Sequence, residues 1–509
     1  MKRFKKINLN PVMTFLILIL FTLILSGFLN LIGFEATYNK INIETGEYTV
    51  VSESVESLFN LSGIKYIFSS TVSNFTAFTP LSMLIIVLIG IGIMEKSGFL
   101  KTSFTILTKF CKKYTITFWL VFLSIIFSLA GDIGYVIMIP LAALLFTYGR
   151  RNPILGIVAV YAGLTCGSGI SLFLTSLDSE MLSYTLANAR IIDSTYTLGN
   201  FAFLFIMAFT IIVCSFVITF ITERISISKV EKYEFKEEKR EVRLGKREYR
   251  GLIFAIAAGT IYLLIFIYNI IPGLPFSGKL LDYSQNYYID KLFSYDSFFS
   301  NGFVFIVTMF FVILGLFYGI GAKTIKNNND FCENLTHSLD GTGRTLILIL
   351  LASVLVNVFK KSNIGVVIVT SLTNVIGKGN LSGLVLILVL FLFTAISTLF
   401  LTNPVSKWSI LSTTVVPLFM NSGLSPEFAQ LITRFAECCT IGLTPLLAYF
   451  VIYLSYLEKY NQNDKPITLF TSLKYQVVYG LIVGALLIAI IIGWYLVGLP
   501  IGFGGRITA

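Results

Sequence analysis

Two positively charged side chains, Lys407 and Arg434, lie inside apolar sequence, whereas the other lysines and arginines lie in connecting segments. A charged residue within a membrane is costly unless it is paired or faces a cavity, so both residues are candidates for function. The planar guanidinium group of Arg434 could bind a carboxylate through two parallel hydrogen bonds. Alternatively, Arg434 pairs with Glu437, three residues on, and only holds its helix. We favour contact with a substrate carboxylate.

Four more interpretations each have a structural alternative. Lys407 could attract anions, or its long side chain could reach an aqueous vestibule or cap a helix. Trp408 could stack on an aromatic ring and donate one hydrogen bond, with anchoring at the membrane interface as the alternative. Asp132 could ligate sodium, accept a proton or cap a helix. Asp178 could bind substrate or mark the external end of a span.

The remaining polar residues argue against enzyme chemistry. The chain has one histidine and contains no H-E-x-x-H or G-x-S-x-G motif, so it offers little machinery for acid–base or nucleophilic catalysis. Its six cysteines show no C-x-x-C spacing, which implies neither a disulfide framework nor a zinc site. Hydroxyl side chains in apolar helices often bond back to their own backbone and are weak evidence of a site.

The elements that must position these residues are membrane spans. Of 509 residues, 55% are hydrophobic and 13% are charged, which places the chain in the integral membrane class. A span needs roughly 20 apolar residues. Runs near that length occupy 13–33, 78–95, 199–222, 251–272, 299–321 and 473–498. The first run is too long for a signal peptide and is interpreted as a retained span.

The positive charges predict the topology. With a cytoplasmic amino terminus, 27 of the 38 lysines and arginines fall in cytoplasmic segments and 9 fall in external ones. The net charge of +11 therefore reflects topology and does not indicate a nucleic-acid partner. The stretch 223–250 is the most basic of these segments, and we interpret it as a charged cytoplasmic linker that divides the chain into a first repeat, 1–222, and a second half, 251–509.

The two halves share an order of elements. A predicted re-entrant hairpin at about 114–148 breaks at Ala130, Gly131 and Asp132, and a second, at about 379–420, breaks at Thr402, Asn403 and Pro404. Each hairpin is followed by a span with a polar interruption. The interruptions AGLTCGSG and AECCTIGLTP lie in broken spans at about 154–178 and 427–456.

The repeats are predicted to be inverted. The segment MEKSGFL precedes the first hairpin and the similar FKKSNIG precedes the second, and the charge count places them on opposite sides of the membrane. With the broken spans and a span at 344–359, nine crossings carry the chain from a cytoplasmic amino terminus to an external carboxyl terminus. Inverted repeats with discontinuous helices are typical of secondary transporters, which bind substrate near the midplane. A channel would instead show a repeated filter or charged rings.

Several blocks resemble the p-aminobenzoyl-glutamate transporter (AbgT) family. They are GDIGYVIMIPLAALLF followed by GRRNPILGI, AGLTCGSGISLFLTSLD, SKWSIL followed by VVPLFMNSGLSPE, and the carboxyl-terminal GLPIGFG. The resemblance covers nearly the whole chain. It implies an all-α polytopic protein with about nine transmembrane helices and two re-entrant hairpins, forming a homodimer in the bacterial inner membrane. It also implies transport of p-aminobenzoyl-glutamate or related antimetabolites such as sulfonamides, driven by a cation gradient and without a cofactor.

The resemblance carries four substrate-binding residues onto this chain: Asp178, Trp408, Pro426 and Arg434. The departures lie where side-chain oxygens would serve a cation: Ser171, Thr398 and Ile441 replace expected asparagines, Asn403 and Val405 replace expected serines, and Glu437 replaces an expected aspartate. The coupling ion is therefore left open between sodium and a proton, with sodium as the single metal considered. The candidate coupling-ion or hairpin-tip residues are Asp132, Ser171, Thr398, Asn403, Glu437 and Thr444.

An alternative within transport is a carrier for another small dicarboxylate or an amino-acid-like solute, because the altered polar positions could change specificity. Competition by unlabelled dicarboxylates would separate the two hypotheses. The preferred mechanism is alternating access, with substrate held between the hairpin tips and the broken helices.

Overall fold

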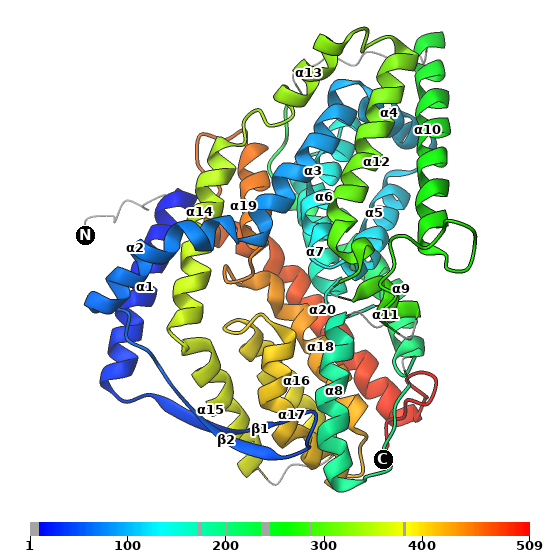
Figure 1. The fold of residues 1–509 in the computed structure, drawn as a ribbon. Coiled ribbons are helices and arrows are strands. Elements are labelled where there is room, and N and C mark those ends of the chain that lie inside the picture. Colours follow the sequence, from blue (N-terminus) through cyan, green and yellow to red (C-terminus); the bar gives the residue numbers. More distant parts are fainter. Residues whose placement is uncertain are drawn as a thin grey trace.

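The computed structural model describes residues 10–171, 176–199, 201–235, 245–285, 288–294, 296–379 and 383–508, and it is built almost entirely of helices (Figure 1). The first half contains α1 (Pro11–Leu31), α2 (Leu61–Thr76), α3 (Thr79–Lys96), α4 (Phe99–Phe110), α5 (Lys113–Phe127), α6 (Ile133–Tyr148), α7 (Pro153–Gly167), α8 (Ser176–Ile192) and α9 (Leu204–Phe220). The second contains α10 (Lys246–Ile270), α11 (Tyr288–Phe293), α12 (Phe298–Ala322), α13 (Asn328–His337), α14 (Gly343–Lys361), α15 (Ile364–Lys378), α16 (Gly383–Thr398), α17 (Pro404–Asn421), α18 (Pro426–Thr440), α19 (Phe450–Lys459) and α20 (Leu469–Val497).

Within the described part of the chain, eight helical segments are long and apolar enough to cross a membrane. Seven of them overlap spans that the sequence predicts, namely all six long apolar runs and the span at 344–359. The eighth, Lys113–Ala130, is the first limb of the first predicted hairpin. The membrane-protein class is thus confirmed, while nine crossings and two re-entrant hairpins stay predictions.

A two-stranded antiparallel sheet follows α1, which the expectation of helices alone did not include. Strands β1 (Glu35–Ile41) and β2 (Tyr48–Ser54) pair with Glu35 opposite Ser54. The sheet lies along α15 and α17 and below α1 in Figure 1. The hydroxyl of Tyr48 donates to the side-chain oxygen of Asn188 in α8 at 2.8 Å, so the sheet is tied to the helices that form the candidate site.

Both predicted hairpin breaks lie where the sequence places them. A 3-10 turn (Ser128–Ala130) follows α5, and Gly131 then adopts a positive φ of 65° before α6 begins. In the second predicted hairpin, α16 ends at Thr398 and α17 begins at Pro404, with Asn403 as its N-cap. Proline fits the first helical position because no intrahelical partner exists there for a backbone N–H.

The interruptions of the broken spans begin later than predicted. Helix α7 continues to Gly167 and α18 continues to Thr440, followed by a 3-10 turn (Ile441–Leu443). The polar side chains that suggested an earlier break bond to their own helix instead. Thr165 donates to the carbonyl of Tyr161 at 3.0 Å, and the Cys438 thiol to that of Arg434 at 3.3 Å. Such back-bonding leaves the helical hydrogen bonds intact.

The two similar segments before the hairpins form the same kind of turn. Gly98 joins α3 to α4 with a φ of 90°, and Asn363 joins α14 to α15 with a φ of 56°. Ser97 and Ser362, which precede them, each donate a hydroxyl to the carbonyl three residues earlier. Glycine and asparagine are the residues that adopt left-handed backbone most readily. The sequence similarity therefore corresponds to a shared local structure.

The predicted linker is partly helical. Helix α10 begins at Lys246, so the last five residues of the 223–250 segment belong to a span-length helix. A π-helical turn (Ile221–Ile225) extends α9 into the start of the segment. Residues 236–244 lie outside the described residues. Helices α10 and α12 pack along each other at the upper right of Figure 1, whereas α8, α16, α17 and α18 gather in its lower half.

Candidate functional site

Arg434 lies at the centre of a group of buried charges. Its side chain is 5% exposed, and its three nitrogens face three partners. Nε lies 2.9 Å from Oδ1 of Asp178, Nη1 lies 2.8 Å from Oε2 of Glu437, and Nη2 donates to the carbonyl oxygen of Ser168 at 2.5 Å. Nη1 and Nη2 thus make hydrogen bonds, whereas Nε faces Asp178 as an ion pair without a hydrogen bond.

Lys407 completes this group from a neighbouring helix. Its Nζ lies 2.9 Å from Oε1 of Glu437 and donates to the hydroxyl of Thr398 at 2.6 Å. The side chains of Lys407 and Glu437 are 0% and 1% exposed. Asp178, Lys407, Arg434 and Glu437 form what we term the buried charge network. It contains two positive and two negative groups, so it is formally neutral, as a buried cluster must be to avoid a large desolvation cost.

Three helices and one loop position the network. Glu437 and Arg434 share one face of α18 because they are three residues apart. Asp178 comes from the first turn of α8, and Lys407 comes from α17, which packs against both helices. The loop after α7 approaches α18 closely because residue 169 is glycine: a Cβ there would lie 2.2 Å from the carbonyl oxygen of Arg434.

Trp408 lies inside the protein beside the network. It is 0% exposed, and its Nε1–H donates to the hydroxyl of Thr185 at 2.9 Å. That hydroxyl donates in turn to Gln430 Oε1 at 2.6 Å, and Gln430 Nε2 donates to the carbonyl of Asp178 at 3.4 Å. Burial excludes interfacial anchoring. Stacking of Trp408 on a substrate ring stays a prediction, and it requires α8 and α17 to separate.

The structure corrects one interpretation of Lys407 and supports the alternative for Arg434. A lysine with no exposed side-chain area does not reach an aqueous vestibule, and its ammonium group pairs with Glu437 because the carboxylate lies within the protein. Arg434 pairs with Glu437, as the structural alternative proposed, but also with Asp178, which lies far away in sequence. Contact between Arg434 and a substrate stays a prediction.

The hairpin-tip residues divide into capping and non-capping types. Asn403 caps α17 by accepting from the backbone N–H of Ser406 at 2.8 Å. Asp132 occupies the equivalent position before α6, is exposed and makes no side-chain capping bond, so the capping interpretation of Asp132 is wrong. The backbone there remains in the right-handed helical region, which points the side chain away from the free N–H groups. Tyr449 of the second half lies beside Asp132.

The other predicted residues lie at different distances from the network. Ser171 donates to Oδ2 of Asp178 at 3.4 Å, and Thr398 contacts Lys407 directly. Thr444 donates to the carbonyl of Leu399 at 2.8 Å and so ties the interruption after α18 to the end of α16. Pro426 begins α18 eight residues before Arg434, about 12 Å away along the helix axis. The structure does not bring Pro426 to the network.

Sequence reasoning missed the polar contacts between the helices. Thr185 and Gln430 connect Trp408 to Asp178, and Asn188 Nδ2 donates to the hydroxyl of Ser412 at 3.2 Å. Gln430 precedes Arg434 by one helical turn on the same face of α18, which is a spacing signal that could have revealed it. Thr185 and Asn188 give no such signal, because hydroxyl and amide side chains are common in helices.

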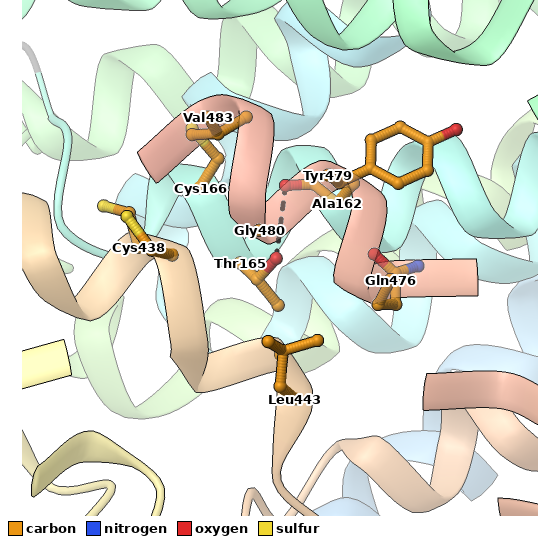
Figure 2. A pocket seen from close by; sticks show the side chains of 11 residues that line it. Ala162, Thr165, Cys166, Cys438, Leu443, Gln476, Tyr479, Gly480 and Val483 are labelled. Carbon is orange, nitrogen blue, oxygen red and sulfur yellow. Dashed lines mark hydrogen bonds between the residues drawn. The ribbon is translucent and has the colours of Figure 1, made fainter. Parts of the chain in front are cut away.

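A small cavity lies between α7, α18 and α20 (Figure 2). Its volume is about 10 Å³, enough for one water molecule and far too small for an aromatic substrate. Thr165, Cys166, Cys438, Gln476 and Tyr479 are among its lining residues, and the dashed line in Figure 2 is the bond from the Thr165 hydroxyl to the carbonyl of Ala162. Among the described residues, no group of three or more His, Cys, Asp or Glu side chains is placed to hold a metal ion.

Comparison with known proteins agrees with this architecture. The model of the AbgT putative transporter family matches residues 6–509. The p-aminobenzoyl-glutamate transport protein of Escherichia coli (strain K12) is 25% identical over 495 residues, which cover 97% of this chain and 94% of the relative.

Two solved structures are also similar. The MtrF structure from Neisseria gonorrhoeae, described as illuminating a class of antimetabolite efflux pumps, is 27% identical and covers 98% of each chain with a TM-score of 0.50. The Alcanivorax borkumensis YdaH transporter is 24% identical, covers 97% of this chain and 100% of that chain, and has a TM-score of 0.48. The near full-length family match, together with the apolar helices, shows that this chain is a multi-pass membrane transporter that belongs to the AbgT putative transporter family.

Proposed function

We propose that this chain is a cation-coupled secondary transporter of p-aminobenzoyl-glutamate or related aromatic carboxylate antimetabolites, and that it works by alternating access. The buried charge network carries the proposal. Arg434 already holds two carboxylates of the protein, and the same fork fits a carboxylate of the substrate. The names of the relatives from Escherichia coli and Neisseria gonorrhoeae support this substrate class.

Asp178 is the carboxylate that a substrate would replace on Arg434. Its side chain is 9% exposed, against 1% for Glu437, and Glu437 is also held by Lys407. Asp178 pairs with one positive group and Glu437 with two, so a substrate carboxylate would displace Asp178 from Arg434 more readily than Glu437. In this mechanism Asp178 occupies the place of the substrate carboxylate in the unloaded protein, and binding exchanges one carboxylate for another on the Arg434 Nε side.

Charge balance gives a reason for cation coupling. The network is neutral without substrate, so each substrate carboxylate that enters adds one uncompensated negative charge to a buried site. A cation that binds with the substrate cancels that charge. The proposed coupling-ion or hairpin-tip residues are Asp132, Ser171, Thr398, Asn403, Glu437 and Thr444.

Alternating access requires that α8 and α17 separate to admit an aromatic ring to Trp408. The bonds from Trp408 to Thr185 and from Asn188 to Ser412 would open in that step. We place the protein in the bacterial inner membrane as a homodimer, with a cytoplasmic amino terminus and an external carboxyl terminus. The distribution of positive charge supports this orientation.

Flux of labelled p-aminobenzoyl-glutamate in proteoliposomes tests the proposal, with sodium and pH gradients imposed separately and in each direction. Accumulation driven by one gradient, absent from protein-free liposomes and from Arg434→Gln, is the expected result. No flux under either gradient would contradict the substrate assignment. Because Trp408 has no exposed ring face here, another small dicarboxylate is the second candidate, and competition by unlabelled dicarboxylates identifies it.

A further inference from the structure

The ammonium group of Lys407 lies in surroundings that would suit a small metal cation. Its Nζ is 2.9 Å from a carboxylate oxygen of Glu437 and 2.6 Å from the hydroxyl oxygen of Thr398. The Thr398 hydroxyl donates its own proton to the carbonyl of Thr394 at 2.8 Å, so it presents a lone pair to Lys407. One oxygen atom from α16 and one from α18 thus contact a positive charge that α17 supplies.

This charge lies just behind the tip of the second hairpin. Lys407 is four residues after Asn403, and its backbone N–H donates to the carbonyl of Asn403 at 3.2 Å. The first turn of α17 therefore fixes the root of the side chain, and the ammonium group folds back towards the end of α16. The side chain has no exposed area, so the charge belongs to the interior and cannot exchange its partners for water.

Each oxygen of Glu437 already lies beside a positive group, although Oε1 makes no hydrogen bond. Oε2 is held by Arg434 Nη1 at 2.8 Å and Oε1 faces Lys407. A sodium ion at this position would have to displace the ammonium group, or it would sit beside the two positive groups Lys407 and Arg434 in a medium of low polarity. Like charges at such a site repel strongly. The position between Glu437 Oε1 and the Thr398 hydroxyl therefore holds one cation, which is the ammonium group of Lys407.

We propose that Lys407 is a tethered counter-cation that fills the cation position behind the tip of the second hairpin, and that it excludes sodium from this position and selects against sodium as the coupling ion. The proposal rests on the proposed transport function. In this proposal Lys407 determines ion selectivity, and Arg434 binds the carboxylate of the substrate.

Binding of radioactive sodium to the purified, detergent-solubilised chain tests the assignment without any substrate. Lys407→Ala removes the ammonium group and leaves Glu437 Oε1 and Thr398 open, so it should bind one more sodium ion per chain than the native protein. Lys407→Arg should show no gain, because a guanidinium group keeps the charge. Lys361→Ala is the matched control, since it removes an exposed lysine that pairs with Glu56 at 2.7 Å.

The gained sodium site should disappear in the double variant Lys407→Ala/Glu437→Gln. The proposal is overturned if well-folded Lys407→Ala gains no sodium site, or if the gain survives the Glu437→Gln change. Should Lys407→Ala fail to fold, transport by the native chain tests the proposal instead. Uphill transport driven by a sodium gradient overturns it, and transport that does not depend on the sodium gradient supports it. Absence of any substrate exchange by the native chain would instead contradict the proposed transport function.

Discussion

Replacing Arg434 by glutamine should separate substrate recognition from stability. The change removes a guanidinium group that faces Asp178, Glu437 and the carbonyl of Ser168. Glu437 keeps Lys407 as its partner, but Asp178 loses its buried positive charge. Removing one partner of a buried ion pair costs about 3–5 kcal/mol, so thermal unfolding should occur at a lower temperature. A charge-assisted hydrogen bond contributes about 1.5–3 kcal/mol, which predicts substrate binding weaker by about 10-fold to 150-fold.

The assay is equilibrium binding of labelled p-aminobenzoyl-glutamate to detergent-solubilised protein, alongside thermal unfolding monitored by size exclusion. The second variant, Asp178→Asn/Arg434→Gln, removes the unpaired charge and should recover much of the lost stability. It should not recover binding, because the carboxylate receptor is still missing. Arg434→Lys keeps the charge but lacks the planar fork, so its affinity should fall between those of the native and glutamine forms.

The reasoning is refuted if folded Arg434→Gln binds substrate with native affinity. It is also refuted if the double variant recovers both stability and binding, because Arg434 would then serve only to neutralise Asp178. An unchanged unfolding temperature in Arg434→Gln would show that Asp178 is not held by Arg434 in the membrane protein.

Three further predictions follow from local geometry. Gly169→Ala places a Cβ 2.2 Å from the carbonyl oxygen of Arg434, so it should displace the loop after α7 and abolish transport. Gly343→Ala is the control, because a Cβ there has no atom within 4 Å and should leave transport unchanged. Substrate flux in proteoliposomes measures both effects. Arg151→Ala breaks a buried ion pair with Glu223 and should lower the free energy of unfolding by about 3–5 kcal/mol, measured by thermal or denaturant unfolding. Hydrogen bonds from neighbouring serines lower the pKa of Asp282 to about 2. The loop should therefore be fully ordered above about pH 4 and lose order as the pH falls towards 2. Amide hydrogen exchange measures this, and equal protection of the loop at both ends of this pH range would contradict the prediction.

The sequence located the helix breaks because they depend on local chemistry. Gly131 supplies a positive φ, and Asn403 and Pro404 supply the cap and first residue of a helix, whatever surrounds them. The same local rules placed the interruptions after α7 and α18 too early. Hydroxyl and thiol groups such as those of Thr165 and Cys438 satisfy backbone carbonyls within the helix, so their polarity does not by itself end it.

The β-hairpin shows where a local pattern failed. Strands β1 and β2 bury few side chains and do not alternate apolar with polar residues, so the period that identifies a strand is weak. Their pairing depends on contact with α15, α17 and α8, which the sequence does not state.

The sequence alone determined that this chain is a membrane protein, because runs of about 20 apolar residues are stable as helices across a lipid bilayer. It also marked Lys407 and Arg434 as unusual, because a charge inside such a run has a high desolvation cost. It also indicated that Arg434 and Glu437 share a helix face. Tertiary structure decided the rest. Asp178 reaches Arg434 from the other half of the chain, and Lys407 turns inward to Glu437, because the packing of α8, α17 and α18 buries these charges and brings opposite charges together.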